Sequence, residues 1–251
     1  MTRNDAITLF AIPYAGGSAA AAYGRWARML PPNIKLSPLE LAGHGRRMPE
    51  PFAASLDAAV ADLLATVLPA ARSGAYAIYG HSMGTTVAYE LIRALDAAGV
   101  PPPLTLFVSG RNPPHYPYPQ RNLHMLDDDT FLAEIRKLGG TPGDFFKLRD
   151  LVKAFLPILR SDYRLIELHK LRLPEHTSDA DIVFFHSDGD VLVSKPALDE
   201  WRRYTRGSLT VHEFHGGHFF INENAAEMCA IMGAQLNDAL VRQGWRRAAA
   251  A

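Results

Sequence analysis

The sequence contains little of three features that would point to a particular partner or compartment. Its single cysteine, Cys229, excludes an internal disulfide and a cysteine-rich metal site. Lysine plus arginine and aspartate plus glutamate each number 26, so no basic excess favours nucleic acid or an acidic membrane surface. No apolar run reaches about 18 residues, and the N-terminus is too polar for a signal peptide. We therefore expect a cytoplasmic protein with neither a nucleic-acid nor a membrane partner.

What the chain does contain is the composition and periodicity of a globular α/β protein. Of its 251 residues, 48% are hydrophobic, which is enough for a sizeable buried core. Strand-like runs alternate with helical patterns, which predicts a mostly parallel sheet with helices on both faces. Strands are expected at 8–13, 34–41, 75–80, 104–110, 181–187 and 208–214, and helices at 19–30, 55–71, 85–100, 195–202 and 223–240.

One interval breaks this alternation. Between Ser109 and Asp181 lie 71 residues, far more than a loop in an α/β unit normally has. Helical patterns at 127–140 and 148–171 indicate that this insertion has its own structure. Pro157 is expected to kink or split the second of these helices.

The insertion is apolar where it should touch the rest of the protein. Its large apolar side chains include Phe131, Phe145, Phe146, Phe155 and Leu156. They suit either additional core or a cap over a site, and the point of insertion favours the cap. We expect a core made of residues 1–112 and 179–251, with a helical lid at 113–178.

A serine stands between two glycines where a strand pattern ends and a helical pattern begins. In the stretch Gly80-His-Ser82-Met-Gly84, the glycines allow a sharp strand-to-helix turn. Such a turn holds the serine in a strained conformation with its hydroxyl at the edge of the sheet. The amide of Met83 would then be one donor to a developing oxyanion. The alternative is a tight glycine turn with an incidental serine.

A serine nucleophile needs a histidine base and a carboxylate that orients it, both later in the chain. His218 lies in a glycine-rich loop after the last expected strand, and His215 is its competitor. Asp188 and Asp190 follow the strand at 181–187, and either could be the acid or cap a turn. Loop or supporting roles are expected for His44, His81 and His186.

Further motifs give the chain a family resemblance. They are PYAGGSA, ELAGHGRRMPEP, GHSMG, SGRNPP and GGHFF, and together they span nearly the whole sequence. The chain resembles the type II thioesterases of polyketide and nonribosomal peptide assembly lines, which have the α/β-hydrolase fold. The resemblance implies a triad of Ser82, Asp190 and His218, with the backbone amides of Ala15 and Met83 as oxyanion donors.

The chain departs from the family pattern at three positions. The family motif at the acid is G-x-x-D-P-x-V, and this sequence matches it at Asp190 with Val191 in place of the proline. Ser187 replaces the glycine of that motif, and Ala42 replaces the proline of the P-G-x-G-x-R-x-x-E-P loop. The family motifs therefore support the assignment of Ser82 and His218 more strongly than that of Asp190.

The resemblance also implies a reaction and a partner. Members of this family hydrolyse stalled or wrongly primed acyl groups from the phosphopantetheine of acyl or peptidyl carrier domains, without a metal or a diffusible cofactor, and we expect a monomer. A general serine carboxylesterase or lipase would share the serine turn and the lid. A chain-terminating thioesterase domain and a catalytically inactive receptor on the same fold are further alternatives.

Overall fold

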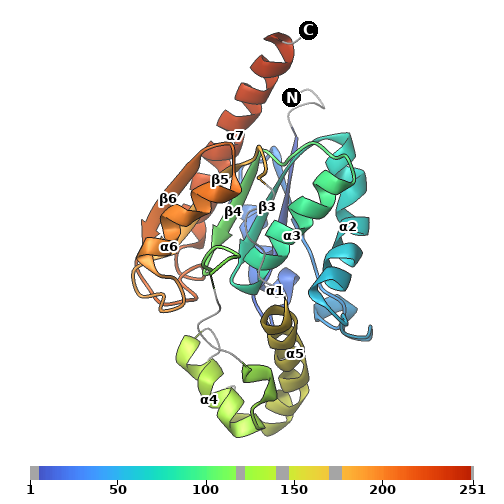
Figure 1. The fold of residues 1–251 in the computed structure, drawn as a ribbon, viewed down its shortest axis with the longest axis vertical. Helices are drawn as coiled ribbons and strands as arrows, with labels where there is room; N and C mark the ends of the chain where they lie inside the picture. Colours follow the sequence, from blue (N-terminus) through green and yellow to red (C-terminus); the bar gives the residue numbers. More distant parts are fainter. Residues whose placement is uncertain (1–5, 117–121, 140–146, 170–176, 250–251) are drawn as a thin grey trace.

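The computed structural model describes residues 6–116, 122–139, 147–169 and 177–249 (Figure 1). Within these ranges, six strands form one sheet in the order β2-β1-β3-β4-β5-β6, and all neighbouring pairs are parallel. The strands are β1 Ile7–Ile12, β2 Ile34–Pro38, β3 Ala75–His81, β4 Thr105–Ser109, β5 Asp181–Ser187 and β6 Leu209–Phe214. The expected parallel sheet is confirmed.

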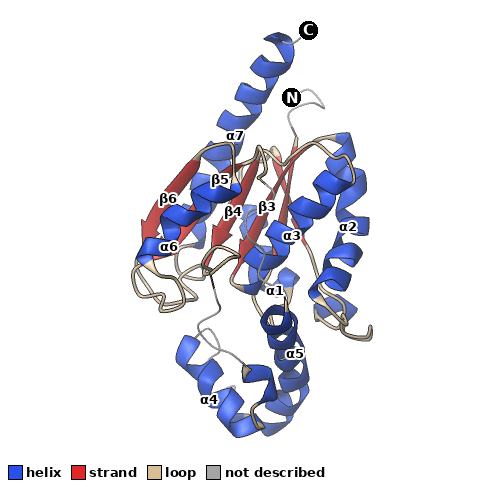
Figure 2. Cartoon of the chain, in the orientation of Figure 1, coloured by secondary structure: helices blue, strands red, loops and turns tan. Residues whose placement is uncertain are grey.

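Helices cover both faces of the sheet (Figure 2). One face carries α2 Leu56–Ser73, α3 Met83–Ala97 and α6 Lys195–Glu200, and the other carries α1 Ala19–Tyr23 and α7 Ala225–Ala249. Successive strand residues serve opposite cores: Phe184 packs into the first, and Val183 and Phe185 pack into the second. Burial on both faces explains why the inner strands β1, β3, β4 and β5 are largely apolar, whereas the edge strands β2 and β6 are partly exposed and carry polar residues.

Two helices differ from what the sequence predicts, one at a glycine and one at a proline. The helix expected at 19–30 ends at Gly24, a weak helix former, and continues as a 3-10 helix over Gly24–Arg28. Of the two effects expected of Pro157, a kink or a split, the split does not occur, because α5 runs as one helix over Arg149–Leu168. Pro157 is exposed, so water can satisfy the helix carbonyl that loses its amide partner there.

The insertion lies beyond the carboxyl ends of the strands (Figure 1). Its described α-helices are α4 Asp128–Leu138 and α5, and a short 3-10 helix, Leu123–Met125, precedes them. Phe131 of α4 is fully buried and meets the ring of Tyr163 edge-on at 5.4 Å. Glu167 of α5 accepts hydrogen bonds from the amides of Leu123 and His124 at 2.8 and 3.1 Å, which ties the two parts of the insertion together. Phe145 and Phe146, expected to be apolar contacts, lie outside the described residues.

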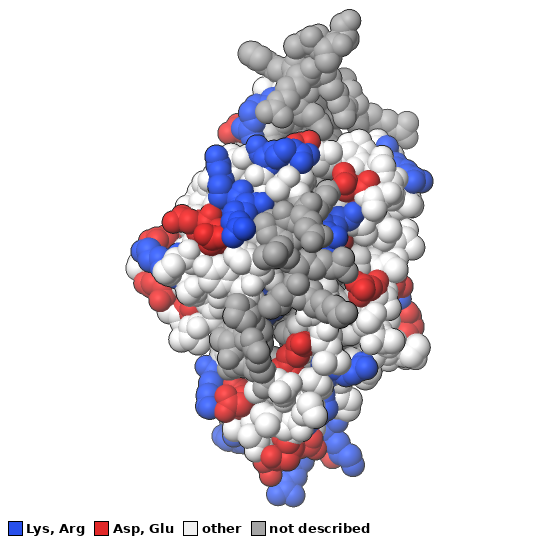
Figure 3. Space-filling model, in the orientation of Figure 1, with Lys and Arg blue, Asp and Glu red and all other residues white. Residues whose placement is uncertain are grey.

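Charges of both signs are interspersed over the face of the molecule shown in Figure 3, including the insertion. Between residues 113 and 176 the sequence has ten lysine and arginine residues and nine aspartate and glutamate residues. Bulk charge of one sign therefore does not characterise the insertion. Among the described helices, none is long and apolar enough to cross a membrane.

Candidate active site

Ser82 occupies the turn between β3 and α3. Its backbone is strained, with φ 55° and ψ −116°. A Cβ added at Gly80 would lie 2.2 Å from the carbonyl oxygen of Gly84, and one added at Gly84 would lie 2.2 Å from that of Ile12. Both positions therefore require glycine, and the expected strand-to-helix turn is confirmed.

Hydrogen bonds from β4 hold this turn in place. The amide of Ser82 donates to the carbonyl of Ser109 at 2.9 Å. The hydroxyl of Thr85 lies 2.8 Å from the carbonyl oxygens of both Gly80 and Ser109. The position of the serine is thus set by two adjacent strands rather than by its own loop.

His218 and Asp190 come together from the loops that follow β6 and β5. Nδ1 of His218 lies 3.0 and 2.9 Å from the two carboxylate oxygens of Asp190, and the side chains are only 3% and 1% exposed. The amide of Leu192 donates to the same carboxylate at 3.0 Å. Because a carboxylate accepts, Nδ1 carries the proton and Nε2 is left as an acceptor.

The competing histidine and aspartate form a separate pair. Nδ1 of His215 lies 2.7 Å from Asp188, with side chains that are 98% and 63% exposed. The hydrogen bond from His215 is the main cause that lowers the pKa of Asp188. The four candidate residues therefore sort into one buried pair and one surface pair.

A second imidazole lies beside His218. The ring centroids of His81 and His218 are 4.9 Å apart, and Nδ1 of His81 lies 2.8 Å from the hydroxyl of Ser109. The hydroxyl of Tyr79 lies 2.9 Å from that of Ser109, so His81, Ser109 and Tyr79 form a chain of hydrogen bonds. Burial, followed by the charge of His218, lowers the pKa of His81 far below its usual value, despite an opposing contribution from the backbone of His218. His81 is therefore a neutral neighbour of His218, a contact that no sequence pattern indicated.

The two predicted oxyanion donors lie at the ends of adjacent elements. Met83 is the first residue of α3, and Ala15 lies in the turn Pro13–Gly17 after β1, which we call the PYAGG turn. The close approach of Gly84 to the end of β1 places the PYAGG turn beside the start of α3. Within the turn, the amide of Gly17 donates to the carbonyl of Tyr14 at 2.9 Å.

Asp162, a fully buried residue of α5, was not predicted from the sequence. Its Oδ2 accepts a hydrogen bond from the amide of Gly16 at 2.7 Å and lies 2.9 Å from Nε2 of His44. The only signal was a charged residue within an apolar helix face, since Leu159, Tyr163 and other neighbours of Asp162 on α5 are buried. Such a signal indicates an unusual contact but not its partner.

Arg47 anchors the loop after β2. Its Nε donates to Glu50 at 2.8 Å, and its Nη1 donates to the carbonyl of Glu40 at 3.1 Å. Arg46, its neighbour, is exposed.

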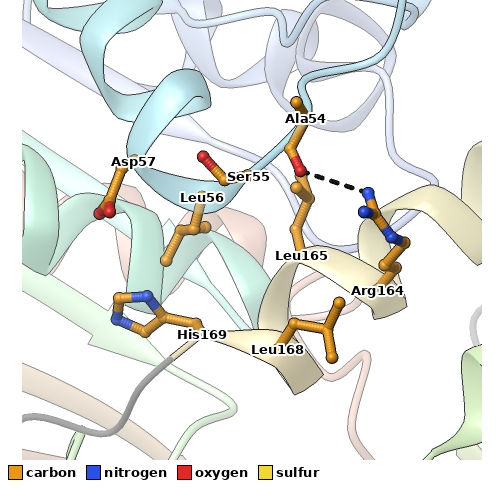
Figure 4. Close-up of a pocket in the computed structure, with 8 residues that line it drawn as sticks. All are labelled: Ala54, Ser55, Leu56, Asp57, Arg164, Leu165, Leu168 and His169. Carbon is orange, nitrogen blue, oxygen red and sulfur yellow. Dashed lines mark hydrogen bonds between the residues drawn. The ribbon is translucent and has the colours of Figure 1, made fainter.

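A cavity of about 430 Å³ lies between the start of α2 and the end of α5 (Figure 4). It is lined by residues 54–57 and by Arg164, Leu165, Leu168 and His169, and Arg164 donates to the carbonyl of Ala54 at 3.2 Å. None of the predicted site residues lines it.

Metal or thiol chemistry has no evident site in the described part of the chain. No group of three histidine, cysteine, aspartate or glutamate side chains there could hold a metal ion. Cys229 is buried, and this burial raises the pKa of its thiol to about 12 against a smaller opposing effect of Arg25. The thiol is thus part of the core.

A parallel sheet of this order, with a serine on a glycine-bounded turn between β3 and α3, defines the α/β-hydrolase fold. The profile of the family described as "Thioesterase domain" matches residues 7–236. The chain therefore belongs to the thioesterase family, whose members hydrolyse thioesters.

Similar proteins include thioesterases of named biosynthetic pathways. "Thioesterase PikA5" of Streptomyces venezuelae is 35% identical over 90% of this chain and 79% of its own length. ClbQ, from the colibactin nonribosomal peptide and polyketide pathway, has a solved structure that is 37% identical, with a TM-score of 0.89 over 94% of this chain and 99% of its own. The solved structure of the type II thioesterase BorB from the borrelidin biosynthetic cluster is 32% identical, with a TM-score of 0.82 over 92% of this chain and 93% of its own. The resemblance to type II thioesterases is confirmed.

Proposed function

We propose that this protein is a type II thioesterase that uses Ser82, His218 and Asp190 to remove aberrant or stalled acyl groups from the phosphopantetheine of carrier domains in a polyketide or nonribosomal peptide synthase. The observation that carries the proposal is the buried His218–Asp190 pair in a thioesterase-family chain whose serine stands on a strained strand-to-helix turn. No metal or diffusible cofactor takes part in the proposed reaction.

In the first half of the reaction, Asp190 holds the Nδ1 proton of His218 and stabilises the imidazolium that forms. Nε2 takes the proton of the Ser82 hydroxyl as the serine oxygen attacks the thioester carbonyl carbon. The amides of Met83 and Ala15 donate to the resulting oxyanion. The tetrahedral intermediate collapses by breaking the carbon–sulfur bond, which leaves an acyl ester on Ser82. His218 then gives its Nε2 proton to the departing thiolate and is neutral again.

The leaving group suits this arrangement. A thiol has a pKa of about 8.5, so a pantetheine thiolate leaves with little protonation, whereas an amine must be handed a proton. In the second half, His218 deprotonates a water that attacks the acyl ester. The carboxylic acid is released, and Ser82 recovers its proton from His218.

A carrier domain as partner agrees with the relatives and with the surface of the protein. The mixed charge of residues 113–176 favours docking through shape, apolar contact and a few local pairs over bulk attraction. Arg46 is exposed and could supply one such pair, whereas Arg47 is held by Glu50. The insertion at 113–178 acts in this proposal as a lid over the acyl group.

The test is a paired measurement with one short acyl group on three supports: a carrier domain, coenzyme A and a simple oxoester. Contacts with the carrier lie far from the reacting carbon, and their binding energy raises kcat/KM. We expect the highest kcat/KM on the carrier and the lowest on the oxoester. Equal kcat/KM on carrier and coenzyme A, with faster cleavage of the oxoester, would instead indicate a general serine esterase.

A further inference from the structure

Helix α5 of the insertion packs directly on the PYAGG turn. Gly16 has a φ of 76°, and a Cβ added there would lie 2.7 Å from the Phe155 ring and 2.8 Å from a Leu159 methyl carbon. The amide of Gly16 donates to Oδ2 of Asp162 at 2.7 Å. Phe155, Leu159 and Asp162 are spaced four and three residues apart, so one face of the helix makes all these contacts. The residue next to Gly16 is Ala15, the second predicted oxyanion donor.

The same carboxylate oxygen also holds His44. Nε2 of His44 lies 2.9 Å from Oδ2 of Asp162, and its Nδ1 lies 3.0 Å from the carbonyl oxygen of Ala42. Both ring nitrogens therefore face groups that only accept, an arrangement that an imidazolium satisfies and a neutral imidazole does not. Burial lowers the pKa of His44, but the hydrogen bond and charge of Asp162, the carbonyl of Ala42 and the charge of Glu40 together raise it above its usual value.

This arrangement is a poor way to stabilise the fold alone. Asp162 is fully buried, and its other oxygen, Oδ1, has no hydrogen-bond partner among the described residues. A buried carboxylate loses its hydration, and an unpaired oxygen on it adds to that cost. An apolar residue at this position would pack α5 without either cost. We therefore look for the role of this carboxylate in the two groups that it contacts, the Gly16 amide and the His44 ring.

We propose that Asp162 and His44 are positioning residues through which α5 fixes the PYAGG turn, so that the Ala15 amide is aimed at the oxyanion formed on Ser82. The inference rests on the proposed function, because it assigns a supporting role in that reaction. Asp162 acts through the Gly16 amide, and His44 orients Asp162 from the opposite side. Seating of α5 and completion of the oxyanion site are then a single event, and a protein whose α5 is displaced is catalytically incompetent.

The main test removes the acceptor while keeping the helix. Asp162→Ala leaves the Gly16 amide without a partner, and a misaimed oxyanion donor should lower kcat about 10- to 100-fold with KM changed less than about twofold. Asp162→Asn keeps an acceptor oxygen for Gly16 and should recover most of this loss. Asp150→Ala is the matched control, since Asp150 is an exposed carboxylate in the first turn of the same helix. It should leave both constants unchanged.

A second arm covers the case in which Asp162→Ala does not fold. His44→Ala leaves Oδ2 with one donor instead of two, and kcat should then fall about 3- to 10-fold at constant KM. In the wild-type protein, NMR titration of the His44 ring should give a pKa above its ordinary value, and Asp162→Asn should lower it. This measurement does not depend on turnover.

The outcomes separate the inference from the proposed function. Ser82→Ala is assayed alongside. Retained turnover in that variant would refute the proposed function, while the His44 titration would still test the contact between His44 and Asp162. Wild-type kcat in Asp162→Ala, or in His44→Ala if the first variant does not fold, would overturn the inference. A fall in kcat/KM caused by KM alone, or a His44 that titrates at or below its ordinary value, would do the same.

Discussion

Two histidine–aspartate pairs stand on the same two loops of this protein and differ mainly in burial. The loop after β5 supplies Asp188 and Asp190, and the loop after β6 supplies His215 and His218. The contact distances are similar, at 2.7 Å for the outer pair and 2.9 Å for the inner pair. The outer pair is exposed to water, whereas the inner pair is almost completely enclosed.

In the proposed reaction, a short histidine–aspartate distance alone is not enough to make a catalytic base. Water screens the outer pair, so the aspartate there holds the tautomer and orientation of its histidine only weakly. The inner pair is packed against His81 and excluded from water, and its geometry is therefore fixed. Burial selects one of two chemically identical pairs for the reaction proposed for this site.

The largest effect should come from the residues that exchange the proton. Ser82→Ala or His218→Ala should lower kcat about 10⁴- to 10⁶-fold because the triad acts as a unit. His215→Ala, the matched change in the outer pair, should stay within about twofold of wild type. Steady-state hydrolysis of an acyl-carrier thioester measures this, with thermal melts to verify folding. A large loss of kcat in His215→Ala would show that the outer pair also takes part in the reaction.

The carboxylates should differ in the same way but less strongly. Asp190→Asn should lower kcat about 10²- to 10⁴-fold, because an amide can donate to His218 and favour the wrong tautomer. Asp188→Asn should cost less than about threefold, since its partner is at the surface. Both variants are compared at matched stability by urea unfolding. If Asp188→Asn were the more damaging, Asp188 would be the acid.

A third pair, His44 with Asp162, extends the comparison to stability. The pKa of His44 is raised in the folded protein, so its contribution to the free energy of unfolding is complete below its ordinary pKa of about 6.5. That contribution is lost as the pH rises through the raised folded value. The stability advantage of wild type over His44→Gln should therefore shrink from about pH 6 to pH 9 in urea unfolding. An advantage that grows with pH would contradict the charged pair.

The insertion should show the smallest and most local effect. If residues 113–176 form a lid, their amides should exchange faster than those of the sheet and be slowed by a bound acyl analogue. Within the insertion, the stretch of α5 near Leu159 and Asp162 should exchange more slowly than α4, because it is packed on the PYAGG turn. Hydrogen exchange with mass spectrometry measures both. Uniform protection that ligand does not change would make the insertion ordinary core.

Much of the fold was predictable because the relevant signals are local. Strands buried on both faces read as unbroken apolar runs, and β5 falls on the residues expected for it. The glycines around Ser82 were interpretable because a close backbone approach tolerates no Cβ. Gly24 was a local signal for the end of α1, whereas the continuity of α5 through Pro157 was not predictable, since it depends on which side of the helix meets water.

The sequence predicted which loops carry the site residues, but not which of two nearby aspartates in one loop belongs to the site. Asp188 and Asp190 are two residues apart with the same chemistry, and only the path of their loop separates them. The contact between Gly16 and Asp162 joins residues 146 positions apart, and no periodicity reports it. The contact between the rings of His81 and His218 was not predictable for the same reason, since only the tertiary structure brings them together.

The central claim is that Ser82 is the nucleophile and that the buried pair, not the exposed one, activates it. The most direct measurement is the rate at which a serine-directed fluorophosphonate labels the protein, with the modified residue identified by peptide mass spectrometry. We expect the label on Ser82, at the wild-type rate in His215→Ala and at least about 100-fold more slowly in His218→Ala. Labelling elsewhere, or equal rates in the two histidine variants, would contradict the account.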